Sequence, residues 1–171
     1  GWRSFYTKDT KVQVPEDLEG MKIRVQESQT AMNMVRLLGG SPTPISFGEL
    51  YTALQQGIVD GAENNPPSMY LTRHYEVCKY YGLNEHTYVP DVLLVSVHLW
   101  EDLSEQERQW LQEAAREATV YQRKLWDESV QESMDEMRAA GVEIYRPDKE
   151  PFMAKVTPMY EDYRDQPEVN D

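Results

Sequence analysis

Several side chains that could bind an organic anion fall where the sequence predicts the carboxyl ends of strands. Arg24 lies near the end of the alternating stretch MKIRV, and Phe47 sits in the turn of ISFGE. Asn64 and Asn65 follow the stretch IVDG. A guanidinium offers a fork of donors to a carboxylate, an amide can serve hydroxyls, and an aromatic ring can cover an apolar side. Because ligands gather at the carboxyl ends of strands in open α/β sheets, these residues predict an organic-anion pocket.

Two further charged residues accompany this group. Arg3 lies in a short predicted strand and could supply a second cation. Glu63 could orient Arg24 or Arg3, since a carboxylate that faced an anionic ligand would be unfavourable. His86 has no nucleophile beside it, and a lone histidine is more often a hydrogen-bonded structural residue. We therefore expect no catalytic residues.

Alternating strands and helices must position these side chains. Period-two patterns and turn residues predict strands at 3–7 and 21–26, a strand followed by a turn within 58–64, and an extended stretch at 41–46. Amphipathic patterns with serine starts, a capping box at Ser46 and Glu49, and glycine stops predict helices at 15–20, 28–40, 46–57 and 67–80. This alternation indicates an α/β architecture with a parallel sheet.

The second half of the chain has a different character. The apolar run VLLVSV, residues 92–97, predicts a buried strand. From Ser104 a helical pattern continues to Gly141 without proline or glycine, which at ~1.5 Å per residue exceeds 50 Å. We expect this helix to bend or to bridge two bodies. A strand at 142–147, a helix at 150–163 interrupted at Pro158, and a polar tail follow.

Composition excludes several classes of partner. A formal net charge of −13 argues against binding to nucleic acid and to anionic membrane surfaces. Cys78 is the single cysteine, and the three histidines lack metal-ligand spacing, so we expect no metal and no cofactor. No stretch approaches the ~20 apolar residues of a membrane span. The opening GWRSFYT reads like the middle of a domain and carries no leader pattern.

Three blocks of sequence carry a family resemblance: PEDLEGMKIRV, GGSPTPISFGELYTALQQGIVDGAENNP and KYYGLNEHTYVPDVLLVS. Together they resemble the DctP-type solute-binding subunit of tripartite ATP-independent periplasmic (TRAP) transporters. The resemblance implies an α/β fold of the periplasmic-binding-protein type II kind, with two lobes and a long helix crossing between them. Residues 1–89 with 130–171 would form the second lobe, and 90–129 would be a crossing segment that belongs to the first.

The resemblance also implies roles for the candidate residues. Arg24 would form a salt bridge with the substrate carboxylate, Asn64 would assist it, and Phe47 would pack on the ligand. Arg3 matches a second family arginine whose spacing varies. The implied protein captures a small organic carboxylate in the periplasm and delivers it to the membrane permease subunits, without catalysis.

The ligand class and two rival functions remain open at this point. The RSFYT and AENNPPS versions of the motifs look more like relatives that bind sugar acids, such as hexuronates, than those for C4-dicarboxylates. Asn64 and Asn65 supply amides suited to hydroxyls. The alternatives are the ligand-sensing ectodomain of a signalling receptor, or an enzyme on sugar acids that uses Glu63 and His86.

Length gives a last expectation. Members of the resembled family are roughly twice as long, so the N-terminal lobe would be largely absent from these 171 residues. Residues 90–129 would then expose an apolar surface for lack of partner strands. Exposed apolar patches favour association, so we expect this chain by itself to dimerise or exchange a segment.

Overall fold

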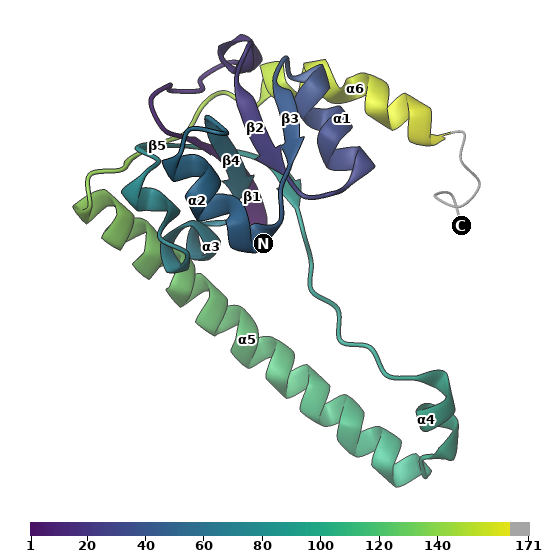
Figure 1. Cartoon of the computed structure of the whole chain (residues 1–171). Helices are drawn as coiled ribbons and strands as arrows, with labels where there is room; N and C mark the ends of the chain where they lie inside the picture. The colour runs from purple at the N-terminus through teal and green to yellow at the C-terminus, as the bar shows by residue number, and fades with distance from the viewer. Residues whose placement is uncertain (165–171) are drawn as a thin grey trace. The chain divides into compact units, whose positions relative to one another are not determined.

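A computed structural model describes residues 1–164. The chain divides into two compact units, one formed by Gly1–Val89 with the chain from Ser133 onward and the other by Pro90–Glu132. The tail at 165–171 lies outside the described residues. Figure 1 shows the elements of the first unit: β1 (Trp2–Thr7), η1 (Pro15–Leu18), β2 (Lys22–Val25), α1 (Gln29–Leu37), β3 (Ser41–Pro44), η2 (Phe47–Glu49), α2 (Leu50–Gln55), β4 (Gly61–Asn64), α3 (Pro66–Leu71), η3 (His74–Glu76), β5 (Tyr80–Tyr88), β6 (Glu143–Tyr145) and α6 (Glu150–Arg164).

The six strands form one mixed sheet in the order β3-β2-β4-β1-β5-β6. β2 pairs in parallel with β3 and β4, and β5 pairs in parallel with β6. β1 is antiparallel to both β4 and β5. The expectation of a parallel sheet is therefore wrong for β1, whose direction the alternation of elements does not determine because its partners follow more than 50 residues later in the sequence.

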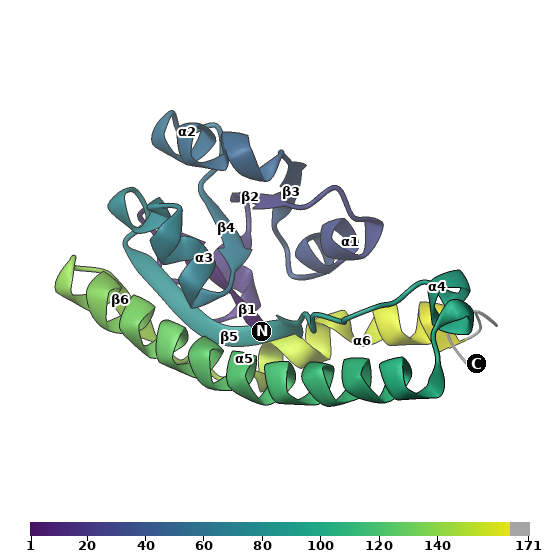
Figure 2. The same cartoon turned by 90° about the horizontal axis from the view of Figure 1, so that it is seen from below.

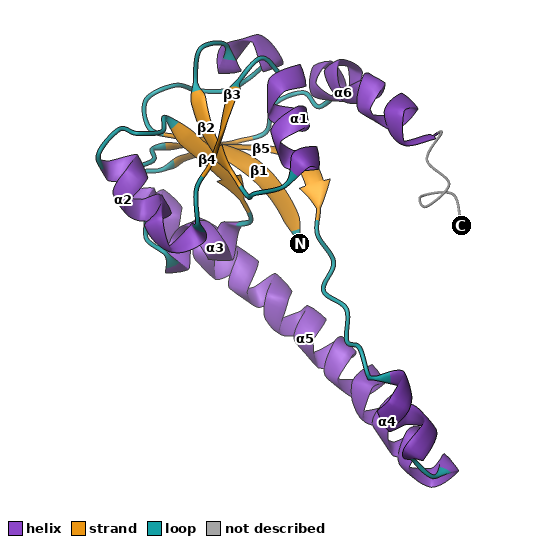
Figure 3. Ribbon diagram, turned by 45° about the vertical axis from the view of Figure 1, so that its right-hand side comes forward, coloured by secondary structure: helices purple, strands orange, loops and turns teal. Residues whose placement is uncertain are grey.

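Helices cover both faces of this sheet. The helices α1 and α6 lie on one face of the sheet, and α2 and α3 lie on the other. Both the view from below (Figure 2) and the view coloured by secondary structure (Figure 3) show this arrangement. The main apolar core lies under α1 and α6. It comprises Phe5, Val12, Leu18, Met21, Ile23, Val25, Met34, Val35, Leu38 and Phe152. Because side chains alternate along a strand, Arg24 points to the opposite face from Ile23 and Val25, toward α2 and α3.

Local sequence explains most helix boundaries, with two exceptions. Ser28 caps α1 by accepting a hydrogen bond from the N–H of Ala31. Ser46 instead donates to the Glu49 carboxylate at 2.6 Å and makes no cap bond, so the expected capping box is wrong. α6 continues through Pro158, where an interruption was expected. Both Pro158 and Ala154 are exposed, so water can solvate the carbonyl that loses its donor.

The helix expected at 67–80 breaks in the structure. α3 ends at Leu71, Arg73 adopts a left-handed conformation (φ 61°), and η3 follows. β5 then begins at Tyr80, so a strand occupies residues 81–88, which the sequence analysis left unassigned. β5 carries an irregularity opposite Ser4, where Glu85 has a positive φ of 50°. This bulge moves the side chains of residues 84–86 relative to β1.

The second unit contains α4 (Val97–Asp102) and most of α5 (Glu105–Ala139). Ser104 and Glu107 form a reciprocal capping box at the start of α5. The strand expected at 92–97 is wrong: residues 91–96 are irregular, and Leu93 and Leu94 are 80% and 82% exposed. A strand needs a neighbour for its backbone hydrogen bonds, and among the described residues this segment has none. No helix within residues 1–164 is long and apolar enough to span a membrane.

Candidate functional site

The sheet topology brings the candidate side chains to one edge. Arg24 lies near the carboxyl end of β2, and Asn64 ends the parallel neighbour β4. Because β1 is antiparallel to β4, the start of β1 meets the end of β4, and Ser4 lies opposite Asn64. Arg3 therefore reaches the same edge. Phe47 opens η2 directly after β3, which is also parallel to β2.

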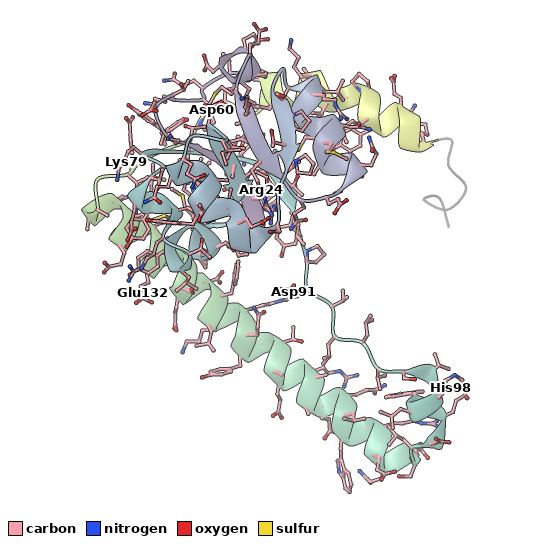
Figure 4. All side chains as sticks on the ribbon, viewed as in Figure 1. Arg24, Asp60, Lys79, Asp91, His98 and Glu132 are labelled. Atoms are coloured by element: carbon pink, nitrogen blue, oxygen red, sulfur yellow. The ribbon has the colours of Figure 1, made fainter. Side chains whose placement is uncertain are left out.

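Arg24 is a buried cation without an ion-pair partner among the described residues. The residue is 3% exposed, and its Nε donates to the carbonyl of Ile45 at 2.8 Å. Its Nη1 is buried without a hydrogen-bond partner, and Arg24 forms no ion pair with any residue in 1–164. Figure 4 shows it on the sheet. Burial lowers the pKa of Arg24. An unpaired buried donor on a cation is unfavourable, and an anion with oxygen acceptors would relieve that cost.

The ring of Phe47 accompanies this guanidinium. Arg24 Cζ lies 5.7 Å from the Phe47 ring centroid, within the range of a cation–π contact. Phe47 is 45% exposed, so part of its ring remains open to a ligand. A flat cation and an exposed aromatic face at one strand edge suit a small molecule with a carboxylate and an apolar side.

Arg3, in contrast, is already paired. Its Nε and Nη2 bind the two carboxylate oxygens of Glu63 at 2.6 and 2.8 Å, and Nη2 also donates to the Glu63 carbonyl at 2.9 Å. Burial would raise the pKa of Glu63, but interactions with His86 and Arg3 outweigh it and lower that pKa. Burial would lower the pKa of Arg3, but the hydrogen bond to Glu63 and the charge of Glu63 together outweigh it and raise that pKa. Of the two arginines that Glu63 could orient, it orients Arg3.

Asn64 has its amide fixed in orientation by two donors. Its Oδ1 accepts hydrogen bonds from Arg3 Nη1 and from the backbone N–H of Asn65, both at 2.9 Å. Nδ2 makes no hydrogen bond with the residues the structure describes, so its two protons can serve a ligand oxygen. Asn64 belongs to β4 rather than to a turn, and its φ is not positive.

Asn65 performs a structural task at this edge. Its Oδ1 accepts from the N–H of Ser68 at 2.9 Å and caps α3, whose first residue is Pro66. The turn of two asparagines and two prolines is thus explained in part by helix initiation. The structure places Asn64 toward the arginines and Asn65 at the helix start.

His86 lies beside the Arg3–Glu63 pair, next to the glutamate with which the enzyme alternative had paired it. Its Nε2 is 3.5 Å from Glu63 Oε2, and its Nδ1 is 3.0 Å from Asn84 Oδ1. The ring stacks on Phe5 with centroids 4.3 Å apart. The β5 bulge produces this arrangement, and no local sequence pattern signals it. Nδ1 is thus hydrogen-bonded, whereas Nε2 is buried without a hydrogen-bond partner among the described residues.

Tyr6 and His74 were also missed, although both lie on the Arg24 face of the sheet. Tyr6 shares a cross-strand position with Ala62, and Ala62 lies opposite Arg24. The Tyr6 hydroxyl is 2.8 Å from His74 Nδ1, and both residues are buried. Burial and the charge of Arg24 lower the pKa of His74 to about 4. The alternation within RSFYT could have placed Tyr6 on this face, whereas His74 had no signal.

A separate hollow lies at the other end of β2. It has a volume of about 310 Å³ and is lined by Lys8, Asp9, Thr10, Glu19, Gly20, Met21 and Asp60. Figure 4 labels Asp60 and Arg24 and shows that they lie apart on the sheet. Three carboxylates against one lysine make this hollow unsuited to an anion. Within residues 1–164 no cluster of histidine, cysteine, aspartate or glutamate could hold a metal ion.

Comparisons with family models, curated proteins and solved structures all match the chain to the same family. The family model described as bacterial extracellular solute-binding protein, family 7, matches residues 1–166. A solute-binding protein of Chromohalobacter salexigens is 44% identical over 99% of this chain, which covers 51% of that protein. The chain spans about half the length of the curated relatives it matches.

Two solved structures are similar over nearly all of the chain. One is a TRAP periplasmic solute-binding protein from Chromohalobacter salexigens with bound D-glucuronate (TM-score 0.93, 44% identity, 99% of this chain and 57% of that one). The other comes from Xanthobacter autotrophicus and holds β-D-galacturonate (TM-score 0.90, 42% identity, 100% and 57%). The expected α/β fold with a long helix is confirmed by these matches.

The buried neutral His74 makes stability depend on pH. Its folded pKa of about 4 lies below the ordinary value of 6.5, so the unfolded chain binds the proton more readily. Stability from this group is complete above pH 6.5 and falls as the pH drops toward 4. We expect the free energy of unfolding to fall by about 2 kcal/mol between pH 7 and pH 5, where most carboxylates stay ionised.

Urea unfolding followed by circular dichroism at both pH values measures this loss. His74→Phe should remove that part of the slope, whereas the exposed His98→Gln should leave it unchanged. If the free energy of unfolding of His74→Phe falls with pH as steeply as that of the parent protein, other groups cause the pH dependence.

Proposed function

The chain belongs to family 7 of the bacterial extracellular solute-binding proteins, a family of periplasmic and non-enzymatic proteins, and we propose that it captures a sugar acid. The observation that carries the proposal is Arg24, a buried guanidinium with an unpaired N–H and no ion-pair partner within residues 1–164. A carboxylate supplies both the missing charge and the missing acceptor. In the full-length protein the bound acid would pass to the membrane subunits of a TRAP transporter.

Each remaining group at the edge has a part in this proposal. Arg24 binds the carboxylate, Phe47 covers an apolar face of the sugar, and Asn64 donates Nδ2–H to an oxygen. Arg3 keeps one N–H beyond the bonds it makes to Glu63 and Asn64 and contributes from the side. Glu63 acts indirectly by orienting Arg3, and Asn65 does so by capping α3.

A uronate fits this set better than an unhydroxylated acid. The edge offers more amide and guanidinium N–H donors than a single carboxylate can use. Hydroxyl oxygens of a sugar can accept hydrogen bonds from the remaining donors. The two similar structures hold D-glucuronate and β-D-galacturonate. A C4-dicarboxylate is the competing ligand, and it would need a second cation, which the Arg3–Glu63 pair does not freely provide.

A thermal-shift screen of the full-length protein tests the ligand class. We expect hexuronates to raise the melting temperature most, because at a fixed concentration a ligand that binds more tightly stabilises the folded state more. Aldonates, C4-dicarboxylates and 2-oxo acids should raise it less. Stabilisation by the unhydroxylated acids alone would contradict a sugar-acid site, and turnover of any acid would contradict a binding protein.

Substitutions of Arg24 should affect affinity most. Loss of a buried, hydrogen-bonded charge pair costs ~2–5 kcal/mol, or roughly thirty- to several-thousand-fold in Kd, so Arg24→Ala should be the worst variant. Arg24→Lys should follow closely, because lysine keeps the charge without the planar fork. Asn64→Ala should cost about 1–3 kcal/mol.

Calorimetry with D-glucuronate on the full-length protein measures these values. Arg36→Ala removes an equal charge from an exposed position on α1 and serves as the control that should bind like the parent. If Arg24→Lys also binds like the parent, the carboxylate is held elsewhere, with Arg3 as the next candidate.

We further propose that residues 1–89 with 130–171 form one ligand-binding lobe, and that residues 90–129 pack with the other lobe of a two-lobed fold. The exposed apolar side chains of Leu93, Leu94 and Val97 support this assignment, because such a run is normally covered. In the chain of residues 1–171 alone, a second copy would cover them.

Light scattering on the chain of residues 1–171 should therefore report a dimer. Leu93→Glu should shift it toward monomer, because a charge would be buried in the contact. Leu71→Glu is the matched control: Leu71 is 73% exposed but lies on α3 in the other unit. A monomeric parent at working concentration would contradict the proposed self-association.

A further inference from the structure

His74 joins Tyr6 of β1 to Phe47 of η2. Its ring stacks on Tyr6 with centroids 5.7 Å apart, and it meets the Phe47 ring edge-on at 5.9 Å and 77°. Phe47 in turn lies 5.7 Å from the Arg24 guanidinium. Three aromatic side chains from different elements thus form a continuous row that ends at the buried cation.

The backbone fixes His74 at this place. Arg73 takes a left-handed conformation that a non-glycine residue seldom adopts, and this turns the chain so that η3 begins at His74. The carbonyl of His74 accepts hydrogen bonds from the N–H groups of Val77 and Cys78 at 3.1 and 2.8 Å. The residue is 1% exposed. Its position is therefore determined by its surroundings, at a local conformational cost.

The hydrogen bond to Tyr6 sets the orientation of the imidazole. Burial raises the pKa of the Tyr6 hydroxyl, so this group keeps its proton and can donate it to Nδ1 of a neutral His74. The proton of the ring then resides on Nε2. A ring held in one plane presents one fixed edge to Phe47, which a freely rotating side chain would not do.

We propose that His74 is a positioning residue for ligand binding: oriented by the Tyr6 hydroxyl, its ring holds the Phe47 ring against the Arg24 guanidinium, so that both meet the ligand together. The inference rests on the proposed function of this site. Phe47 needs such support because it is 45% exposed and lies in a three-residue helix. Without it, binding would have to order the Phe47 side chain, which weakens affinity.

A double-mutant cycle in the full-length protein tests the inference, with Kd for D-glucuronate measured by calorimetry. His74→Gln keeps an acceptor for Tyr6 and loses the ring. It should weaken binding by roughly three- to tenfold, the range of an aromatic edge contact. In a Phe47→Leu background the same change should add almost no loss, because His74 acts through Phe47.

Two further variants separate positioning from stability. His74→Phe retains the ring and should recover part of the affinity lost in His74→Gln. Val35→Ala removes buried volume from α1 on the opposite face of the sheet, so it should lower the melting temperature without changing Kd. A Kd for His74→Gln equal to the parent value would overturn the inference, as would losses that simply add in the Phe47→Leu background.

The outcomes distinguish this inference from the proposed function. If the parent protein binds no uronate, the proposed function fails and the inference fails with it. If the parent binds a uronate but His74→Gln does not change Kd, the inference alone is wrong. The same holds if the losses from His74→Gln and Phe47→Leu simply add.

Discussion

The Arg3–Glu63 ion pair determines which of two buried arginines remains available to a ligand. Both carboxylate oxygens of Glu63 bind Arg3, so Glu63 forms its ion pair with Arg3 and not with Arg24. Arg24 is left with a carbonyl oxygen, an aromatic face and an unpaired N–H. A buried charge without an ion-pair partner is costly, and under the proposed function a ligand carboxylate would offset that cost.

The antiparallel direction of β1 makes this pairing geometrically accessible. A parallel β1 would place Arg3 at the far edge of the sheet, away from the end of β4. The approach of β1 to β4 is close: a Cβ atom at Gly61 would lie 2.5 Å from the Tyr6 carbonyl oxygen. Glycine at this position therefore permits the strand contact that sets Ser4 opposite Asn64. One residue without a side chain supports the register of the whole site.

Sequence reasoning placed Arg24, Phe47 and Asn64 near strand ends, where the structure also has them, because strand alternation and turn residues are local signals. It could not find His74 or His86, whose places depend on a left-handed residue and on a bulge opposite a strand some 80 residues away. The run at 92–97 failed for a related reason. Its apolar residues led to the prediction of a buried strand, but a strand also requires a partner, and a local pattern does not say where the partner lies.

Net charge and local charge act on different partners. At physiological ionic strength, screening limits the field of the acidic surface to about 8 Å, so the charge of −13 opposes extended polyanions more than a small acid. At the buried guanidinium of Arg24, the surrounding protein screens poorly, and its attraction for a carboxylate is correspondingly greater. An acidic protein can therefore exclude nucleic acid and anionic surfaces while binding an anion at one cation. The proposed site requires an arginine without an ion-pair partner, and Arg24 remains one because Glu63 forms its ion pair with Arg3.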